Sequence, residues 1–434
     1  MDMAKKGITA GLNINNKSED FNELMIELGN LCSACDIDVV GSITQNAKQV
    51  NRAFYIGTGK VEELLNLIKK ESIEVVVFYN ELSTSQLKNL EEKLNCEIID
   101  RTALILDIFA QRAKTREAKL QVEVASLKYM LPRLVGSNEN LGRQSGGVGT
   151  KNRGSGEKKL ELDRRRIEEK ITFLNRELDD LKFQRETQRS MRRKSNLPNV
   201  ALVGYTNAGK SSIMNKLVDI FKNSEEKKVF EKNMLFATLE TSVRNIILAN
   251  NKEFLLSDTV GFVSNLPHDL VKAFRSTLEE ACEADVLLHV IDISNPSYKN
   301  HIKVTEDTLK QIGADGIPMI HVYNKIDLID VEVLDEILDS IDKEGLFVSV
   351  KKDINIDKMI KCICDSIFKD YVRCKLLIPY DKGHVVSYFN ENASVISTEY
   401  REDGVILDVE CSNIEYNKYK KVCFRVNFEK IIIA

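Results

Sequence analysis

Apolar residues follow two alternating patterns over the first hundred residues of the chain. Val75–Phe78 and Ile98–Ile99 are short apolar runs that predict strands, whereas Lys60–Lys69 and Leu82–Leu94 carry apolar residues at helical spacing. Strands that alternate with helices favour a parallel sheet covered by helices. Residues 1–102 are therefore predicted to form a small N-terminal α/β domain.

A longer and more charged helical pattern occupies residues 103–197. Ala103–Tyr129 predicts one long helix, and the stretch from Gly156 to about Lys194 predicts another. Residues 138–156 are rich in Gly, Ser and Asn and lack periodic apolar residues, which is typical of a loop. The segment is predicted to be a helical hairpin linker with a glycine-rich basic loop at its tip.

The tip of this hairpin is a candidate RNA-binding element. Arg143, Lys151 and Arg153 place positive charge in a glycine-rich loop, where the main chain can approach phosphates closely. Few aromatic side chains lie there, which favours recognition of phosphates and shape in a structured RNA over base stacking. A solvated charged surface without a partner is the alternative that remains open.

The remainder of the chain has the pattern of a large α/β domain followed by a small one. In residues 198–372, apolar strands such as Val200–Val203 and Pro318–Tyr323 are each followed by polar or glycine-rich residues. This pattern predicts a mostly parallel sheet with helices on both faces. Residues 373–434 alternate short strands with a helix-compatible stretch, and we predict a small α+β domain without a catalytic constellation.

One stretch in the large domain predicts phosphate binding. Gly204–Ser211 matches G-x-x-x-x-G-K-[ST] and stands between an apolar strand and a helix-compatible run. Its backbone N–H groups are expected to surround phosphates, and the next helix directs its positive end at the same anion. Lys210 is expected to reach the β and γ phosphates, and Ser211 to bind Mg²⁺. The predicted phosphate-binding residues are Gly204, Tyr205, Thr206, Asn207, Ala208, Gly209, Lys210, Ser211 and Ser212.

Later motifs identify the base as guanine. Asn324–Asp327 reads N-K-x-D, and Asp327 can accept hydrogen bonds from guanine N1 and N2 that adenine cannot supply. Asp258–Gly261 follows another apolar strand, where the carboxylate can hold Mg²⁺ through water and the glycine N–H can meet the γ phosphate. The predicted residues are Asp258, Thr259, Val260 and Gly261 at the phosphate, and Asn324, Lys325, Ile326, Asp327, Ser349, Val350 and Lys351 at the base.

The catalytic residues are predicted to be Lys210, Thr238 and Gly261. Thr238, with Thr241 as the alternative, is expected to bind Mg²⁺ while a γ phosphate is present and to release it after hydrolysis. Phe262 stands where a glutamine would orient the attacking water, so basal GTP hydrolysis is expected to be slow. The predicted switch residues are Phe236, Ala237, Thr238, Leu239 and Glu240. Residues 198–372 are accordingly predicted to form a P-loop GTPase domain with GTP as substrate.

Gly57–Lys60 resembles a phosphate loop but fails its pattern. Phe54 stands where the first glycine belongs, and Val61 replaces the serine or threonine. We predict a turn that opens a helix. A second nucleotide site in this domain is the alternative.

Composition changes this picture little. Hydrophobic residues make up 43% and charged residues 29% of the 434, which is typical of globular proteins, and the net charge of −4 gives no overall sign of nucleic-acid binding. Without an apolar run of about 20 residues or a signal-peptide core, we expect a cytoplasmic monomer with no membrane span. Nine cysteines indicate no disulfide framework, and Cys32 and Cys35 are predicted to be buried thiols on one helical face, not zinc ligands.

Several segments together resemble the HflX family of translational GTPases. Gly57–Leu64 and Arg101–Ala113 are similar to markers of the family's N-terminal domain. Gln144–Gly149 and Glu161–Arg165 resemble its loop and helix signature, and Phe236–Leu239 its switch. The likeness covers nearly the whole chain. It departs at Ser155, where the family usually has proline, so this loop is expected to be looser.

The resemblance implies a ribosome-associated GTPase. Such proteins bind the large ribosomal subunit and its rRNA in the GTP state, split or rescue stalled or idle ribosomes, and leave after hydrolysis to GDP. Two other readings stay open from sequence: an RNA-binding scaffold that uses nucleotide as a slow switch, and a GTPase of rRNA maturation or tRNA modification.

Overall fold

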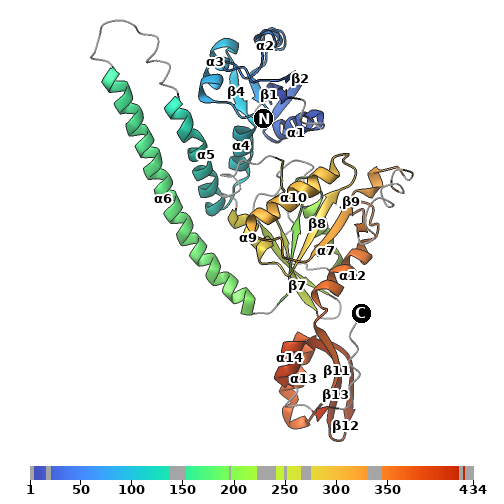
Figure 1. Ribbon diagram of the computed structural model, residues 1–434. Helices are drawn as coiled ribbons and strands as arrows, with labels where there is room; N and C mark the ends of the chain where they lie inside the picture. Colours follow the sequence, from blue (N-terminus) through green and yellow to red (C-terminus); the bar gives the residue numbers. More distant parts are fainter. Residues whose placement is uncertain are drawn as a thin grey trace. The chain divides into compact units, whose positions relative to one another are not determined.

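The computed structural model describes residues 4–15, 21–136, 153–194, 197–221, 241–248, 252–264, 275–330, 332, 334, 345–419 and 424–425 (Figure 1). The chain divides into two compact units. The first comprises Met1–Met191, Lys232–Glu240 and Val263–Thr277, and the second comprises Arg192–Glu231, Thr241–Phe262 and Leu278–Ala434.

The N-terminal domain is a parallel four-stranded sheet in the order β2-β1-β3-β4, as the sequence predicts. Its central strand, β1, was not among the predicted strands. The strands are β1 (Lys5–Ile14), β2 (Ile37–Ala47), β3 (Val75–Phe78) and β4 (Glu97–Asp100), and the helices are α1 (Phe21–Ala34), α2 (Thr58–Glu71) and α3 (Thr84–Leu94).

The stretch that resembles a phosphate loop opens α2, as predicted. Gly57 is the N-cap of α2, and its N–H donates to Oε1 of Gln45 on β2 at 2.8 Å. Lys60 forms an ion pair with Glu63 one turn further on, at 2.7 Å. Cys32 is buried as expected, whereas Cys35 is half-buried, and no cluster of three metal-ligating side chains occurs among the described residues.

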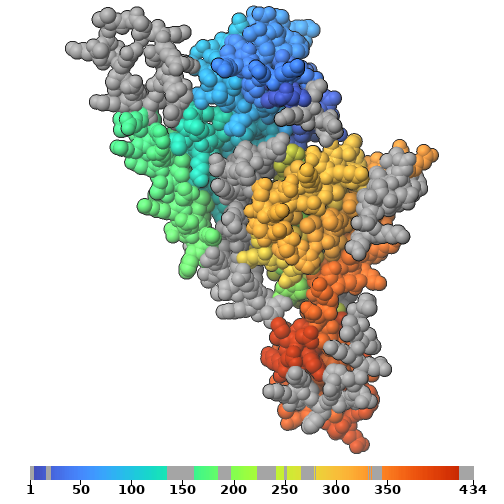
Figure 2. All heavy atoms as spheres, in the orientation of Figure 1, coloured from blue at the N-terminus to red at the C-terminus, as the bar shows by residue number. Residues whose placement is uncertain are grey.

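The single helix predicted over Ala103–Tyr129 is wrong, because the structure has two helices there, α4 (Arg101–Arg112) and α5 (Arg116–Gly136). Ala113 adopts an extended conformation that ends α4, and the Thr115 hydroxyl accepts from the Ala118 N–H at 3.2 Å. A side-chain cap of this kind favours a new helix start. Helix α6 (Arg153–Lys194) lies beside α5 in Figures 1 and 2.

The contact between α5 and α6 combines an apolar cluster with two ion pairs, Arg116–Glu177 at 3.1 Å and Lys170–Glu123 at 2.6 Å. Leu120 and Val124 of α5 pack with Leu174 of α6 in one small buried cluster. At 1.5 Å per residue, the 42 residues of α6 span about 63 Å. Arg143 and Lys151 lie outside the described residues, and Arg153 is the first residue of α6.

The second unit contains a six-stranded sheet in the order β10-β9-β8-β5-β7-β6. Only β6 runs antiparallel to its neighbour, so the predicted mostly parallel sheet is confirmed. Its strands are β5 (Asn199–Val203), β6 (Ser242–Ile247), β7 (Glu253–Asp258), β8 (Val286–Asp292), β9 (Met319–Asn324) and β10 (Leu346–Phe347).

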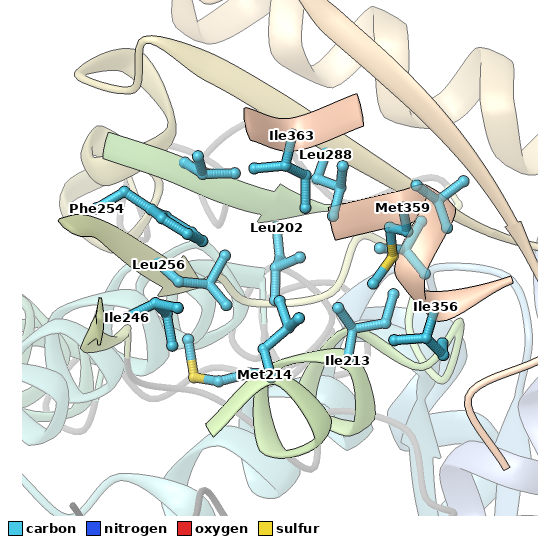
Figure 3. Packing of buried hydrophobic residues seen from close by; sticks show 14 of the residues in the cluster. Leu202, Ile213, Met214, Ile246, Phe254, Leu256, Leu288, Ile356, Met359 and Ile363 are labelled. Atoms are coloured by element: carbon cyan, nitrogen blue, oxygen red, sulfur yellow. The ribbon is translucent and has the colours of Figure 1, made fainter. Parts of the chain in front are cut away.

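Strand β5 divides the core of this sheet between its two faces. Val200 and Leu202 belong to one buried cluster, with α7 (Lys210–Ile220) and α12 (Ile356–Ile367), while Ala201 and Val203 belong to the other, with α9 (Arg275–Cys282) and α10 (Tyr298–Ile312). Figure 3 shows Leu202 among the side chains of the first cluster. A strand buried on both faces must be apolar throughout.

The last part of the chain forms a four-stranded antiparallel sheet in the order β12-β13-β11-β14, with Val385 and Phe389 of its first helix in the core. Lys252 forms an ion pair with Glu410 at 2.6 Å, and both side chains are largely buried. The elements are β11 (Tyr371–Ile378), α13 (Gly383–Asn392), β12 (Ser394–Arg401), β13 (Gly404–Ser412), α14 (Asn413–Tyr419) and β14 (Phe424–Arg425). The four-domain boundaries drawn from the sequence stay a prediction.

Among the described residues, no helix is both long and apolar enough to cross a membrane.

Leu202→Ala is expected to destabilise the domain built on the six-stranded sheet by about 3 kcal/mol, because it opens a cavity in the core of that sheet. Leu202 is fully buried, whereas Leu162 on α6 is 52% exposed and provides the matched control. Urea unfolding followed by circular dichroism measures both variants. Equal unfolding midpoints for the two variants would contradict the assignment of Leu202 to the core.

Candidate functional site

The loop between β5 and α7 is held by glycines that no other residue replaces without rearrangement. Gly204 has φ +145°, and a Cβ there would lie 2.2 Å from the Val290 carbonyl oxygen of β8. Gly209 has φ +103°, and a Cβ there would lie 2.2 Å from Nδ2 of Asn324. Both conformations are ones that L side chains rarely adopt. The first and last glycines of the motif thus bring the loop against β8 and β9.

Lys210 is buried at the first turn of α7. Its Nζ donates to the Gly204 and Tyr205 carbonyl oxygens at 3.0 and 2.8 Å, so the ammonium lies inside the loop. Burial lowers the pKa of Lys210 to about 8, against the opposing effect of the Asp258 carboxylate. A cation kept in such a position gains most from an added anion, since burial strengthens its electrostatic interactions.

Ser211 and Asp258 are brought together by the parallel pairing of β5 and β7. The Ser211 hydroxyl donates to Asp258 Oδ2 at 2.7 Å, and Asp258 is fully buried at the end of β7. Two oxygen ligands of this kind suit Mg²⁺, which binds few protein groups and takes its other oxygens from phosphates and water. The donor set therefore fits the predicted metal.

The Asp258–Gly261 segment packs directly on the phosphate loop. A Cβ at Gly261 would lie 2.7 Å from Thr206 Cα and 3.1 Å from Lys210 Nζ, so only glycine fits there. The Thr259 hydroxyl donates to the Leu202 carbonyl oxygen at 2.7 Å and is therefore turned toward β5. Thr206 Oγ1 is buried and has no hydrogen-bond partner among the described residues. Gly261, Thr206 and Lys210 converge at one point.

Phe262 is a core residue, which the sequence did not reveal. Its ring is 2% exposed and packs with Ala201, Val203 and Leu278. Its N–H donates to the Gly204 oxygen at 3.1 Å, and its carbonyl accepts from the Thr206 N–H at 2.8 Å. A glutamine at this position would orient water through its side chain. Here the side chain points into the core, and the main chain is what meets the phosphate loop.

The motif predicted to read the base joins three loops. Asn324 is buried, donates from Nδ2 to the Ala208 oxygen at 2.9 Å and accepts from the Val350 N–H at 3.4 Å. Asp327 Oδ1 accepts from the Ser349 hydroxyl at 2.6 Å. The Ser349 N–H donates to the Ile354 oxygen at 3.2 Å. Asn324 thus links Ala208 of the phosphate loop to Val350, one of the other residues predicted to contact the base.

Two site contacts were missed in the sequence. Asp292 ends β8 and accepts from Lys325 Nζ at 2.6 Å, which fixes the lysine of N-K-x-D. The position of Asp292 directly after an apolar run could have indicated a site residue in the sequence. The Tyr205 ring stacks on His301 of α10, with centroids 3.8 Å apart, and no sequence pattern links these residues.

The remaining predicted residues follow their motifs. Asn207 has φ +62° in the exposed turn of the phosphate loop, and Ala208 is fully buried beside it. The switch residues Phe236, Ala237, Thr238, Leu239 and Glu240 lie outside the described residues. The other members, Ser212 at the start of α7, Val260 beside Gly261, Ile326 after Lys325 and Lys351 after Val350, lie next to the contacts described above.

Family models match three consecutive parts of the chain. Residues 22–110 match the model described as GTP-binding GTPase N-terminal, and residues 112–192 match GTP-binding GTPase Middle Region. Residues 199–325, which contain the phosphate loop and the first two residues of N-K-x-D, match the model described as 50S ribosome-binding GTPase. Together with the fold and the site, these matches define a P-loop GTPase that binds and hydrolyses GTP.

Curated relatives narrow the class to one family. GTPase HflX of Caldanaerobacter subterraneus is 44% identical over 393 residues, which cover 91% of this chain and 88% of the relative. GTPase HflX of Escherichia coli is 36% identical and covers 93% of each chain. The chain belongs to the HflX family of GTPases. A solved GTP-binding protein from Sulfolobus solfataricus in complex with GDP is 25% identical, with a TM-score of 0.45, over 83% of this chain and 98% of that one.

The pKa of Lys210 predicts a pH dependence of nucleotide binding. Without nucleotide, the pKa of Lys210 is about 8, and bound phosphates raise it. Nucleotide binding above pH 8 therefore takes up a proton. GTP affinity is expected to fall about tenfold between pH 7 and pH 9. Titration calorimetry at pH 8.5 in two buffers of different ionisation enthalpy measures the proton. A heat that is independent of the buffer would contradict this prediction.

Asp327→Asn is expected to weaken GTP binding about tenfold to a hundredfold, because a charged acceptor for the base is lost. Asp330→Asn, on an exposed carboxylate three residues later, is the matched control. Fluorescence titration with a labelled guanine nucleotide compares the two. Equal affinities would refute the role of Asp327 in base recognition.

Proposed function

We propose that the predicted nucleotide residues bind GTP and that Lys210, Thr238 and Gly261 act in its hydrolysis. The support is the convergence of Thr206, Lys210 and Gly261 at the point where the phosphate loop meets β7. The Lys210 ammonium would stabilise the charge that develops on the transferred phosphoryl group, and the Gly261 N–H would donate to the γ phosphate. Thr238 would bind Mg²⁺ while the γ phosphate is present and release it after hydrolysis.

Ser211, Thr238 and, through water, Asp258 would hold Mg²⁺. When bound, this ion neutralises charge on the phosphate oxygens. The Ser211 hydroxyl and the Asp258 carboxylate lie 2.7 Å apart, and both are oxygen donors of the type that Mg²⁺ prefers.

Basal turnover is slow in this proposal. The ring of Phe262 packs in the core, so the side chain after Gly261 does not orient water. Among the described residues, the Gly261–Phe262 main chain lies against the phosphate loop, and Thr206 Oγ1 beside Gly261 is buried without a hydrogen-bond partner. A partner that fixes this segment would therefore accelerate hydrolysis.

The protein acts on the large ribosomal subunit and its rRNA. Membership of the HflX family over nine-tenths of the chain, together with a nucleotide domain that matches a 50S ribosome-binding GTPase model, carries this part of the proposal. Arg143, Lys151 and Arg153 are the proposed RNA contacts, and Arg153 is the first residue of α6. In the GTP state the protein binds stalled or idle ribosomes and splits or rescues them, and hydrolysis releases it to the cytoplasm as a monomer.

Sedimentation with isolated ribosomal subunits tests this function. The protein with a non-hydrolysable GTP analogue is expected to co-sediment with large subunits, and large subunits are expected to stimulate GTP hydrolysis at least tenfold, as electrostatic positioning of one group does. Asp330→Asn should behave like the parent, and Asp327→Asn should do neither at the same nucleotide concentration. Absence of both co-sedimentation and stimulation would overturn the ribosome role, and binding without stimulation would favour an RNA-binding scaffold.

Ribosome splitting is tested in a separate light-scattering experiment. Light scattering of intact ribosomes is expected to fall when the protein and GTP are added, and to stay constant with GDP. Binding to large subunits without any fall in scattering would reject splitting and favour a role in rRNA maturation.

A further inference from the structure

Lys252 is a largely buried lysine at the turn between β6 and β7. Its side chain is 11% exposed, and its Nζ donates to Oε1 of Glu410 on β13 at 2.6 Å. The same Nζ lies 4.9 Å from the centre of the Phe368 ring and 5.4 Å from the centre of the Tyr371 ring. Because the Glu410 side chain is also only 12% exposed, the ion pair is shielded from water and holds both side chains in place.

The ion pair lies where the chain passes from the six-stranded sheet to the C-terminal sheet. Phe368 ends α12 and Tyr371 begins β11, and their rings meet edge to face with centroids 4.9 Å apart. On the other side of the turn, the Leu248 N–H donates to the Lys252 oxygen at 2.8 Å, and Leu248 shares a buried cluster with Phe368. All these residues belong to the second compact unit. The turn is therefore held by an ion pair, two aromatic rings and an apolar contact.

The other end of the β6–β7 pair lies at the phosphate loop. The two strands pair antiparallel along their length, and Ser242 at the start of β6 lies opposite Asp258 at the end of β7. Asp258 accepts from the Ser211 hydroxyl at 2.7 Å, and Gly261, three residues further on, lies against the phosphate loop. Six residues of extended chain, about 20 Å, lead from Lys252 to Asp258. A restraint on the turn therefore acts along β7 on the segment predicted to meet the γ phosphate.

We propose that Lys252 is a positioning residue for GTP binding. By pairing with Glu410, it anchors the turn between β6 and β7 to the C-terminal sheet and thereby keeps Gly261 at the phosphate loop. The inference rests on the proposed contact of Gly261 with the γ phosphate. It adds a role for the C-terminal domain, in which the sequence predicts no catalytic constellation: this domain takes part in distinguishing GTP from GDP. Because coupling between two sites is reciprocal, a bound γ phosphate also restrains the C-terminal sheet.

The test is Lys252→Met in the full chain, titrated with a labelled non-hydrolysable GTP analogue and with labelled GDP. Loss of the anchor is expected to weaken binding of the GTP analogue about fivefold, which is the lower end of typical coupling between sites. The affinity for GDP, which has no γ phosphate, should stay within twofold. Lys252→Arg, which keeps a cation beside Glu410, should bind both nucleotides like the parent.

Hydrogen exchange measures the reciprocal effect in the C-terminal sheet. In the parent, a peptide covering residues 404–412 of β13 is expected to exchange more slowly with the GTP analogue than with GDP. In Lys252→Met this difference should disappear, because the ion pair that joins β13 to the turn is lost.

Arg373→Met separates positioning from stability. Arg373 lies opposite Glu410 in the pairing of β11 with β13, but its guanidinium bonds Asp408 at 3.0 and 2.8 Å. Both methionine variants leave a buried carboxylate without its cation and should lower the melting temperature. If Lys252→Met does not fold, the double variant Lys252→Met with Glu410→Gln removes both charges and is measured instead.

Weaker binding of the GTP analogue in Lys252→Met, with normal GDP affinity and with Arg373→Met like the parent, supports the proposal. Unchanged binding in Lys252→Met, an equal loss in Arg373→Met or an equal loss in Lys252→Arg overturns it. Identical exchange of residues 404–412 in the parent with the two nucleotides also overturns it.

The parent protein distinguishes failure of this inference from failure of the proposed function. If residues 257–264 of the parent exchange differently with the GTP analogue and with GDP while Lys252→Met binds like the parent, only the role of Lys252 is rejected. Identical exchange of residues 257–264 in the parent with both nucleotides would reject the γ-phosphate contact itself, and the role of Lys252 with it.

Discussion

The structure depends on one buried positive charge, the ammonium group of Lys210. Lys210 lies in the interior, bonded to two carbonyl oxygens of its own loop, and burial lowers its pKa to about 8. The geometry around it follows from that constraint. Gly204, Gly209 and Gly261 must lack side chains so that β8, Asn324 and Thr206 can close on the same point. The sheet, apolar on both faces, supplies the rigid frame.

The way the candidate site residues come together was largely predictable from sequence, because the parts of the site are local. A strand, a glycine-rich loop and a helix are consecutive residues, and Asp258, Asn324 and Ser349 each follow an apolar strand, so a parallel sheet brings them to one edge. The contacts that escaped prediction join distant segments. Arg101 to Ser264 spans 163 residues, and Tyr205 stacks on His301 without a shared pattern. From sequence, the only prediction for Phe262 was that its side chain does not orient water. Its burial depends on packing against distant residues, which the sequence pattern did not reveal.

The fold was also largely predictable, because most helices and strands follow from local apolar patterns. Helical and strand periodicity gave the parallel N-terminal sheet, but the central strand β1 contains Gly7 and Gly11, which interrupt the apolar run. A Cβ at Gly11 would lie 2.6 Å from Met25 Sδ, so the glycine is there for packing of α1 on the sheet. The break between α4 and α5 is set by the conformation of Ala113 and the Thr115 cap, which periodicity does not report.

Together these contacts bring Lys210, Thr206 and Gly261 to one point in the nucleotide-binding unit. The most direct measurement is hydrogen exchange of the unaltered protein, compared between a non-hydrolysable GTP analogue and GDP. The account predicts that protection of residues 257–264 differs between the two states, because Gly261 lies against Thr206 and Lys210 at the phosphate loop. Protection of residues 257–264 that is identical with the GTP analogue and with GDP would contradict it.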